Sequence, residues 1–215
     1  MAYLTSSTED IIYKTLCVLV SERTSNRNLS DENSINEFNG TFLSNFYPVS
    51  IHYCGKRYPS VEHAYQAQKF EPGVLKCVPR EHHGLIIDAL RVWPKQIDFQ
   101  NLTILFLDRT ISPRHIKLFA DCLGRVGYIR DDWNDIRIRL MIELLQRKFS
   151  HADLQALLLA TNKKYLIENN YWGDTLWGVC DGRGFNLLGH ILMILRDVFL
   201  TDRGSKRCGV APSRG

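Results

Sequence analysis

The chain lacks the short cysteine pairs typical of metal or redox sites. Its 215 residues include six cysteines, at positions 17, 54, 77, 122, 180 and 208, and no C-x-x-C motif. A domain of this size can bury enough apolar surface to fold without disulfides, so we expect reduced thiols. The sequence therefore favours an intracellular protein, cytoplasmic or nuclear.

Long hydrophobic runs are also missing. The early stretch IIYKTLCVLV is interrupted by Lys14 and follows Glu9 and Asp10. A membrane helix needs about 20 apolar residues, and a signal peptide has basic residues before its apolar segment. We therefore expect no membrane partner, and we expect residues 1–20 to form a packed element whose type the sequence leaves open.

Several motifs of common enzyme classes are absent. The chain has no G-x-x-x-x-G-K-[ST] loop, no G-x-G-x-x-G after a strand and no G-x-S-x-G elbow. These absences argue against kinase, hydride-transfer and acyl-transfer chemistry. His82 and His83 are adjacent, and neighbouring side chains on a helix or strand diverge, so the pair does not suit one metal ion. We expect neither a metal nor a cofactor.

The charge is only mildly basic. A formal net charge of +4 and a pI near 8.7 accompany 45% hydrophobic and 23% charged residues, an ordinary composition for a globular protein. Domains built mainly to bind nucleic-acid phosphates are usually more basic. The sequence therefore permits an anionic ligand, and a nucleic-acid protein acting through its basic end is a weaker alternative.

Composition divides the chain into three parts. Residues 21–36 are rich in Ser and Asn, and RGSKRCGVAPSRG at the end combines Gly, Ser, Pro and basic residues without a period. The first pattern is typical of a linker and the second of a frayed tail. We predict an N-terminal extension and polar linker over 1–33, one domain over 34–202 and a flexible basic tail over 203–215.

The domain is predicted to be α+β and mostly α-helical, with a small β-hairpin near its start. Alternation around Ile51 and Tyr53, followed by Gly55, indicates the hairpin. Helices are predicted over 61–70, 113–123, 132–149, 154–160 and 187–200, with Ser60, Ser112, Asp131 and Ser150 as N-caps and a strand at KYLIE. The loop 169–186 contains four glycines and is long enough to be functional.

The predicted helix 61–70 carries a polar face where apolar residues are usual. Glu62, Gln66 and Lys69 lie at spacings of four and seven. This face either lines a substrate pocket or is a solvated surface on which Glu62 pairs with Lys69. Rings near carboxylates, Trp133 in RDDW and the YWGD segment with Asp174, suit a ligand with a flat base and a sugar, although Trp133 also suits a core position.

Several segments of the chain, taken in their order along the sequence, resemble the NADAR family. The family is named for proposed links to NAD and ADP-ribose. The segments are FLSNFYP, YPSVEHAYQAQK, a GR and a Trp before a long helix, KFSHADLQALLLAT, ENNYWGD and GRGFNLLGHILMILRD. They cover most of residues 38–198. Residues 71–110 match poorly, TLWGVCD lengthens the loop after Asp174, and residues 1–33 lie outside the resemblance.

The resemblance implies an N-glycosidase that releases ADP-ribose from ADP-ribosylated guanine, in a nucleoside or in DNA or RNA. Alternatives are an N-glycosidase for ribosylated pyrimidine intermediates of riboflavin synthesis and a non-catalytic module that binds ADP-ribose. The implied catalytic residues are Glu62 and Asp174. The implied substrate-binding residues are Asn45, Phe46, Gln66, Lys69, Arg125, Trp133, Tyr171, Trp172, Gly173 and Asn186. We place the pocket between the helix 61–70, the start of the helix 132–149 and the loop 169–186.

Overall fold

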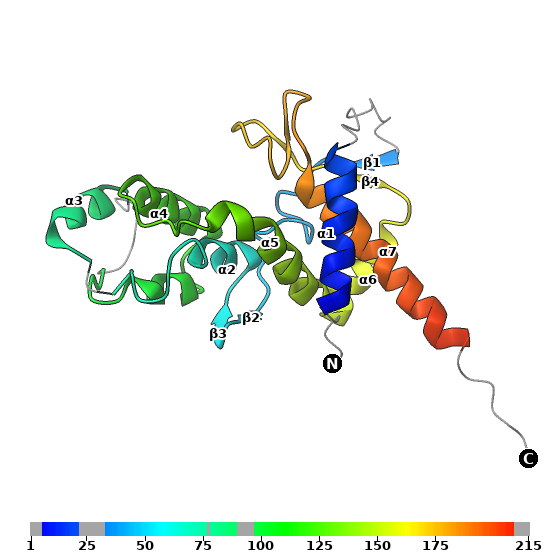
Figure 1. Cartoon of the computed structure of the whole chain (residues 1–215), viewed down its shortest axis with the longest axis horizontal. Coiled ribbons are helices and arrows are strands. Elements are labelled where there is room, and N and C mark those ends of the chain that lie inside the picture. The colour runs from blue at the N-terminus through cyan, green and yellow to red at the C-terminus, as the bar shows by residue number, and fades with distance from the viewer. Residues whose placement is uncertain (1–5, 22–32, 77, 90–96, 209–215) are drawn as a thin grey trace, which may run out of the picture. The chain divides into compact units, whose positions relative to one another are not determined.

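The computed structural model describes residues 6–21, 33–76, 78–89 and 97–208 (Figure 1). Their backbone contacts gather into two compact units. The central unit comprises Asn45–Lys148, and the terminal unit combines Met1–Ser44 with Phe149–Gly215. Both units consist mainly of helices with very small sheets, which confirms the predicted α+β, mostly helical class.

The central unit begins with the predicted hairpin. Strands β2 (Ile51–Tyr53) and β3 (Lys56–Tyr58) pair antiparallel, with Ile51 opposite Tyr58. The two residues between them have positive φ angles, 45° at Cys54 and 71° at Gly55, as hairpin turns of this length require. The following elements are α2 (Val61–Ala67), α3 (Arg80–Ala89), the 3-10 helix η2 (Leu102–Leu107), α4 (Pro113–Arg125) and α5 (Trp133–Phe149).

Helix α2 starts where the sequence predicts and ends earlier. The Ser60 hydroxyl accepts a hydrogen bond from the His63 amide, which confirms Ser60 as the N-cap. The predicted end at Phe70 is wrong, because the helix stops at Ala67. The carbonyl of Lys69 accepts a bond from the Arg130 amide, and Phe70 forms a bridge with Ile129. This distant backbone pairing replaces the last helical turn.

The other helix starts of the central unit follow the sequence with one correction. Ser112 caps α4 and Pro113 occupies its first turn, as predicted. The N-cap prediction of Asp131 for α5 is wrong, because Asp132 immediately precedes the helix and its carbonyl accepts from the Ile136 amide. The Asp132 carboxylate pairs with Arg130.

The terminal unit is built around its last helix. Its elements are α1 (Ser6–Ser21), β1 (Ser34–Ile35), α6 (Ala152–Ala160), β4 (Tyr165–Leu166), β5 (Asn169–Asn170), β6 (Val179–Cys180) and α7 (Leu187–Cys208). Helices α1 and α6 and strand β4 all contact α7, and Figure 1 shows β1 beside β4. Strands β1 and β4 pair in parallel, as do β5 and β6.

Four predictions for the terminal unit can be compared with its helices and strands. The N-terminal element is a helix with Ile12 and Leu16 buried. The N-cap prediction of Ser150 is wrong, because His151 holds that position of α6 without a side-chain capping bond. The predicted strand at KYLIE is present as β4, and α7 continues to Cys208, into the segment predicted as a tail.

Helix α7 approaches β4 with no space between the two backbones. A Cβ atom built on Gly189 would lie 2.1 Å from the Leu166 carbonyl oxygen. Real Cβ atoms do not approach an oxygen so closely, so only glycine fits at this position. The close contact fixes the start of α7 against the strand that leads into the 169–186 loop.

Two further findings concern the whole described chain. Among the described residues no helix is long and apolar enough to cross a membrane. The cysteines Cys17, Cys54, Cys122 and Cys180 are free thiols.

Candidate active site

The polar face of α2 lies inside the central unit. Glu62 is 6% exposed and Gln66 is 3% exposed. The Glu62 amide donates to the Asn45 carbonyl at 3.0 Å, so the segment before the hairpin packs against the first turn of the helix. Lys69 pairs with Asp121 of α4 at 3.3 Å. The solvated-surface alternative, with Glu62 paired to Lys69, is therefore wrong.

Glu62 holds a carboxyl group in an environment that resists its ionisation. Burial raises its pKa above the ordinary value, and the negative charge of Asp121 acts in the same direction. A hydrogen bond from Gln66 and the positive charges of Lys117 and Lys69 oppose this shift. The group can therefore keep its proton at a higher pH than an exposed glutamate. Once ionised, it is attracted by the positive charges of Lys117 in α4 and of Lys69, which follows α2.

Two amide side chains beside Glu62 have unused acceptors. Gln66 Nε2 donates to Glu62 Oε1 at 2.7 Å, while Gln66 Oε1 is buried and accepts no hydrogen bond from the described chain. Asn45 Nδ2 contacts Met141 Sδ at 3.6 Å, and Asn45 Oδ1 is likewise buried without a donor among these residues. Of the predicted site residues, Asn45, Glu62 and Gln66 are thus brought together by direct contacts.

Trp133 lies in the first turn of α5 and is 8% exposed. Its ring meets the Tyr65 ring edge-on, with centroids 5.0 Å apart. This burial supports the core alternative for Trp133. A role as a solvent-lined stacking ring would require its neighbours to move.

Arg125 points to a different part of the central unit. It is exposed near the end of α4 and lines a pocket of about 290 Å³ with Leu85, Asp88, Cys122 and Val126. Burial raises the pKa of the Cys122 thiol, and the positive charge of Arg125 partly opposes this increase. In the described structure Arg125 is therefore not part of the cluster around Glu62.

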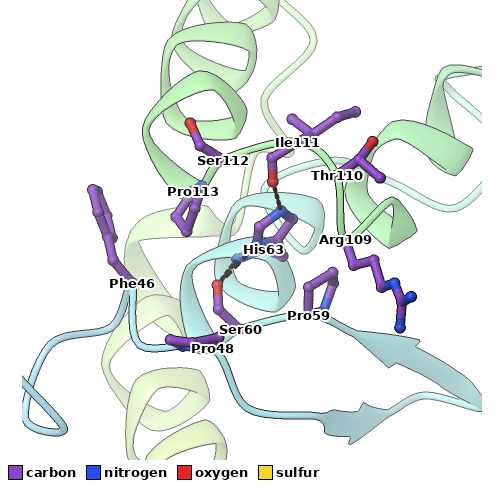
Figure 2. A pocket seen from close by; sticks show the side chains of 10 residues that line it. All are labelled: Phe46, Pro48, Pro59, Ser60, His63, Arg109, Thr110, Ile111, Ser112 and Pro113. Carbon is purple, nitrogen blue, oxygen red and sulfur yellow. Dashed lines mark hydrogen bonds between the residues drawn. The ribbon is translucent and has the colours of Figure 1, made fainter. Parts of the chain in front are cut away.

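Phe46 lines a second pocket of about 250 Å³ (Figure 2). Three prolines form apolar walls, His63 lies at the base, and Arg109, Thr110 and Ser112 supply polar groups. Figure 2 shows the His63 ring bonded to Ser60 and to the Ile111 carbonyl, at 2.8 and 3.1 Å. Since the carbonyl only accepts, His63 Nε2 carries the proton and Nδ1 accepts from Ser60. Burial lowers the His63 pKa to about 4.

Sequence reasoning missed His63, Lys117 and Asp121. His63 follows its cap serine by three residues, and the same Ser-x-x-His spacing recurs at Ser112 and His115 with the same hydroxyl–imidazole bond. That repeated spacing was a usable signal. Lys117 and Asp121 act on Glu62 across α2 and α4, and no local pattern indicates such a pairing.

The predicted loop residues Tyr171 to Asp174 belong to the terminal unit. Asp174 Oδ1 accepts from the amides of Leu176 and Trp177 at 3.1 and 2.9 Å. Both backbone groups of Asp174 bond to the Asn170 side chain. Asp174 thus stabilises the loop in which it lies.

The rings next to Asp174 point outward. Tyr171 is 91% exposed and Trp172 is 53% exposed, and the two rings meet edge-on with centroids 5.2 Å apart. Gly173 follows with a φ of 85°, a conformation that glycine adopts easily. The loop therefore presents an aromatic pair at the surface. Whether Asp174 shares a pocket with Glu62 stays a prediction, since each belongs to a different unit.

Asn186 is structural in this fold. It is 0% exposed, its Nδ2 donates to the Leu166 carbonyl, and its Oδ1 accepts from the Glu168 amide. Both ends of the amide are thus occupied by the backbone. That Asn186 contacts substrate stays a prediction, and its two backbone bonds give it a structural role beside any such contact.

No metal centre is visible in the described part of the chain. Within residues 6–21, 33–76, 78–89 and 97–208, no three His, Cys, Asp or Glu side chains gather in a way that could hold an ion. His82 binds the Tyr128 hydroxyl and His83 binds the Val78 carbonyl, so the adjacent histidines do diverge.

The sequence of the chain is similar to those of several known proteins. The chain is 33% identical over 168 residues to the N-glycosidase YbiA of Escherichia coli, covering 75% of this chain and 82% of the relative. It is 29% identical over 158 residues to an N-glycosidase of Nostoc punctiforme, covering 72% and 83%. A riboflavin biosynthesis protein of Vibrio vulnificus is 34% identical over 162 residues. That match covers 74% of this chain and only 35% of the longer Vibrio protein.

A solved structure and a family profile agree with these relatives. The NMR structure of E. coli YbiA is similar with a TM-score of 0.53 and 25% identity, covering 92% of this chain and 99% of that one. The names of the relatives confirm the predicted enzyme class, hydrolases of N-glycosyl bonds. The NADAR domain profile matches residues 92–200. The chain belongs to the NADAR family.

Proposed function

We propose that the protein hydrolyses the N-glycosyl bond between a nucleobase and a ribose phosphate, with Glu62 at the reacting sugar. The observation that carries this proposal is the burial of the Glu62 carboxyl group at 6% exposure. Burying a carboxylate costs free energy, and such groups cluster at functional sites. A helix that only needed to pack would have an apolar residue at this position.

The chemistry of the bond suits a fixed carboxyl group. When the bond between C1 of the ribose and the base nitrogen breaks, positive charge develops on the sugar, water adds its oxygen to C1, and the base leaves with a proton. An ionised Glu62 would stabilise the cationic sugar more than the neutral one and so lower the barrier. A protonated Glu62 would donate to the leaving base, a role that its raised pKa supports.

Other predicted residues take supporting roles in this proposal. Asp174 would orient the attacking water, and Lys69 would bind a phosphate of the substrate. Tyr171 and Trp172, with 91% and 53% exposure, present aromatic surface to solvent on which a base would stack.

Two substrate classes fit this reaction. The first is ADP-ribosylated guanine, in a nucleoside or in nucleic acid, with ADP-ribose as the product. The second is a ribosylated pyrimidine intermediate of riboflavin synthesis. The names of relatives from Vibrio vulnificus and Arabidopsis thaliana, both riboflavin biosynthesis proteins, favour this second class. Both substrates have a base joined to C1 of a phosphorylated ribose.

The proposal is tested by following product release by chromatography for both substrates and for NAD. Glu62→Gln preserves size and helix propensity, so we expect kcat to fall on the order of 10² to 10³ while product binding, measured by calorimetry, persists. The matched control is Glu71→Gln, which changes a glutamate of the same unit with a 57% exposed side chain. Turnover of Glu62→Gln near that of Glu71→Gln would contradict the catalytic role. Binding of ADP-ribose without any turnover would favour the non-catalytic module.

A further inference from the structure

The side chain of Gln66 is held in one orientation. Its Nε2 donates to Glu62 Oε1 at 2.7 Å, and the two residues are one helical turn apart in α2. Since the nitrogen end of the amide is fixed, the oxygen end is fixed as well. Gln66 Oε1 therefore lies beside the Glu62 carboxyl group and is buried, with the residue only 3% exposed.

This oxygen has no donor in the described chain, and neither has Asn45 Oδ1. The Asn45 backbone carbonyl accepts from the Glu62 amide at 3.0 Å, so both amide side chains belong to residues in direct contact with Glu62. Buried acceptors without a donor are rare in native proteins because they lower stability. Gln66 Oε1 and Asn45 Oδ1 are thus two buried acceptors without a donor in the described chain. They belong to two residues that contact Glu62, whose own Oε1 accepts from Gln66 Nε2.

The charges around these acceptors indicate which kind of donor they take. Three oxygen ligands could suit a hard cation, but the positive charges of Lys117 and Lys69 already act on Glu62. A metal ion would be repelled by these ammonium groups. Neutral hydroxyl groups would not be, and they can satisfy a carboxylate and an amide oxygen together.

We infer that Gln66 selects ribose over 2-deoxyribose, because its Oε1 and the Glu62 carboxylate accept hydrogen bonds from the neighbouring 2- and 3-hydroxyls of the sugar. This inference rests on the proposed function, which puts the ribose against Glu62. Gln66 also acts as a positioning residue, because its Nε2 fixes the orientation of the Glu62 carboxyl group. Removing the 2-hydroxyl of the sugar leaves one buried acceptor unpaired in the complex.

The test compares the binding of ribose 5-phosphate and 2-deoxyribose 5-phosphate by calorimetry. We expect the wild-type protein to bind ribose 5-phosphate about 10- to 100-fold more tightly, the penalty of leaving a buried acceptor without its donor. Gln66→Met keeps the length of the side chain and removes the acceptor, so we expect it to abolish most of this preference. The matched control is Gln146→Met in α5, which removes another buried glutamine and should retain the preference.

Several results would overturn the inference. Equal binding of the two sugars by the wild type, or no binding of either, contradicts it without any variant. An unchanged preference in folded Gln66→Met shows that Gln66 Oε1 holds only a structural water. The proposed function fails in a different way: a protein that prefers ribose 5-phosphate but hydrolyses none of the tested substrates retains the sugar selection and loses the reaction. If the protein hydrolyses ribosyl substrates but binds both sugars equally, the proposed function stands and the selection of ribose by Gln66 is wrong.

Discussion

Helix α2 and the tip of the 169–186 loop differ in which side chains they bury. The helix encloses polar residues, and the loop tip exposes aromatic ones. Helix α2 buries its polar residues, with Glu62 at 6% and Gln66 at 3% exposure. The loop exposes its rings, with Tyr171 at 91%. Polar groups are costly to bury and large rings are usually covered, so each region departs from the ordinary pattern.

The two regions also differ in whether their stabilising contacts come from distant or from neighbouring residues in the sequence. Glu62 depends on neighbours from elsewhere in the chain, including Asn45 and the charges of α4. Asp174 is held by residues within four positions of itself. Changes in α2 should therefore affect the stability of the central unit, whereas changes at the loop tip should affect ligand binding first.

The strongest test of this difference compares two tryptophans. Trp133→Ala removes a ring that is 8% exposed and packs on Tyr65, so we expect a loss of about 3 to 5 kcal/mol in unfolding free energy. Trp172→Ala removes a ring that is 53% exposed, and we expect a change below about 1 kcal/mol. Urea unfolding of both variants measures these values. Similar losses would remove the contrast between the regions.

The second test uses pH and His63. Burial lowers the folded-state pKa of His63 to about 4 from 6.5, so between these values the unfolded chain binds a proton that the folded chain does not. Stability from His63 is complete above pH 6.5 and is lost as the pH falls towards 4, on the order of 3 kcal/mol in total. The negative charge of Asp108 acts on this ring and reduces the shift.

The pKa of Glu62 is shifted in the opposite direction, so its effect on the pH dependence of stability opposes that of His63. A variant is therefore needed to measure the contribution of His63 alone. The raised pKa of Glu62 makes the folded chain bind the extra proton, and this contribution to stability is lost as the pH rises through that range. We expect His63→Gln, which can still donate to the Ile111 carbonyl, to lose less stability than the wild type between pH 7 and 4.5. Parallel curves from urea unfolding at both pH values would contradict the assignment.

The third test separates the two roles of Asp174. Asp174→Ala removes the acceptor for the Leu176 and Trp177 amides, so we expect a stability loss of about 1 to 2 kcal/mol. Asp174→Asn keeps an acceptor oxygen and should melt within a few degrees of the wild type. If the proposed role of its charge is correct, Asp174→Asn lowers kcat about 100-fold. Wild-type turnover would leave Asp174 with its role in the loop alone.

The smallest expected effect is at Tyr171. Because the ring is 91% exposed, Tyr171→Ala should change stability by less than about 0.5 kcal/mol. If a base stacks on this ring, kcat/KM should fall by about tenfold, the lower end of a base–aromatic stacking contact. Phe185→Ala is the control, since that ring is 51% exposed in the same loop. Equal kinetics for the two variants would contradict base stacking on Tyr171.

Local signals in the sequence predicted the starts of α2 and α4. Ser60 and Ser112 cap α2 and α4 as expected, because a cap needs only the serine and the amides that follow it. The end of α2 was missed because the Arg130 amide, far along the chain, takes the Lys69 carbonyl. Such pairings depend on the tertiary fold, which no local pattern contains.

The site was predictable to a similar degree. The spacing of Glu62 and Gln66 indicated one functional face, and their contact confirms that they lie together. The structural role of Asn186 was not predicted, because only its bonds to the Leu166 carbonyl and the Glu168 amide reveal it, and the local sequence does not show them. Arg125 lies in α4 and lines a pocket away from Glu62. The residues of α4 alone do not show which side of that helix is near Glu62.

The close approach of α7 to β4 has a consequence for how this sequence can vary. Gly189 admits no Cβ, since that atom would lie 2.1 Å from the Leu166 oxygen. Tyr171 and Trp172, on the loop between these two elements, are 91% and 53% exposed, so we expect their exchange to disturb neither element. A library randomised at Tyr171 and Trp172 should therefore yield mostly folded proteins with altered ligand preferences, whereas one randomised at Gly189 should yield almost none. New specificities can arise at the tip of the loop for as long as its base is invariant.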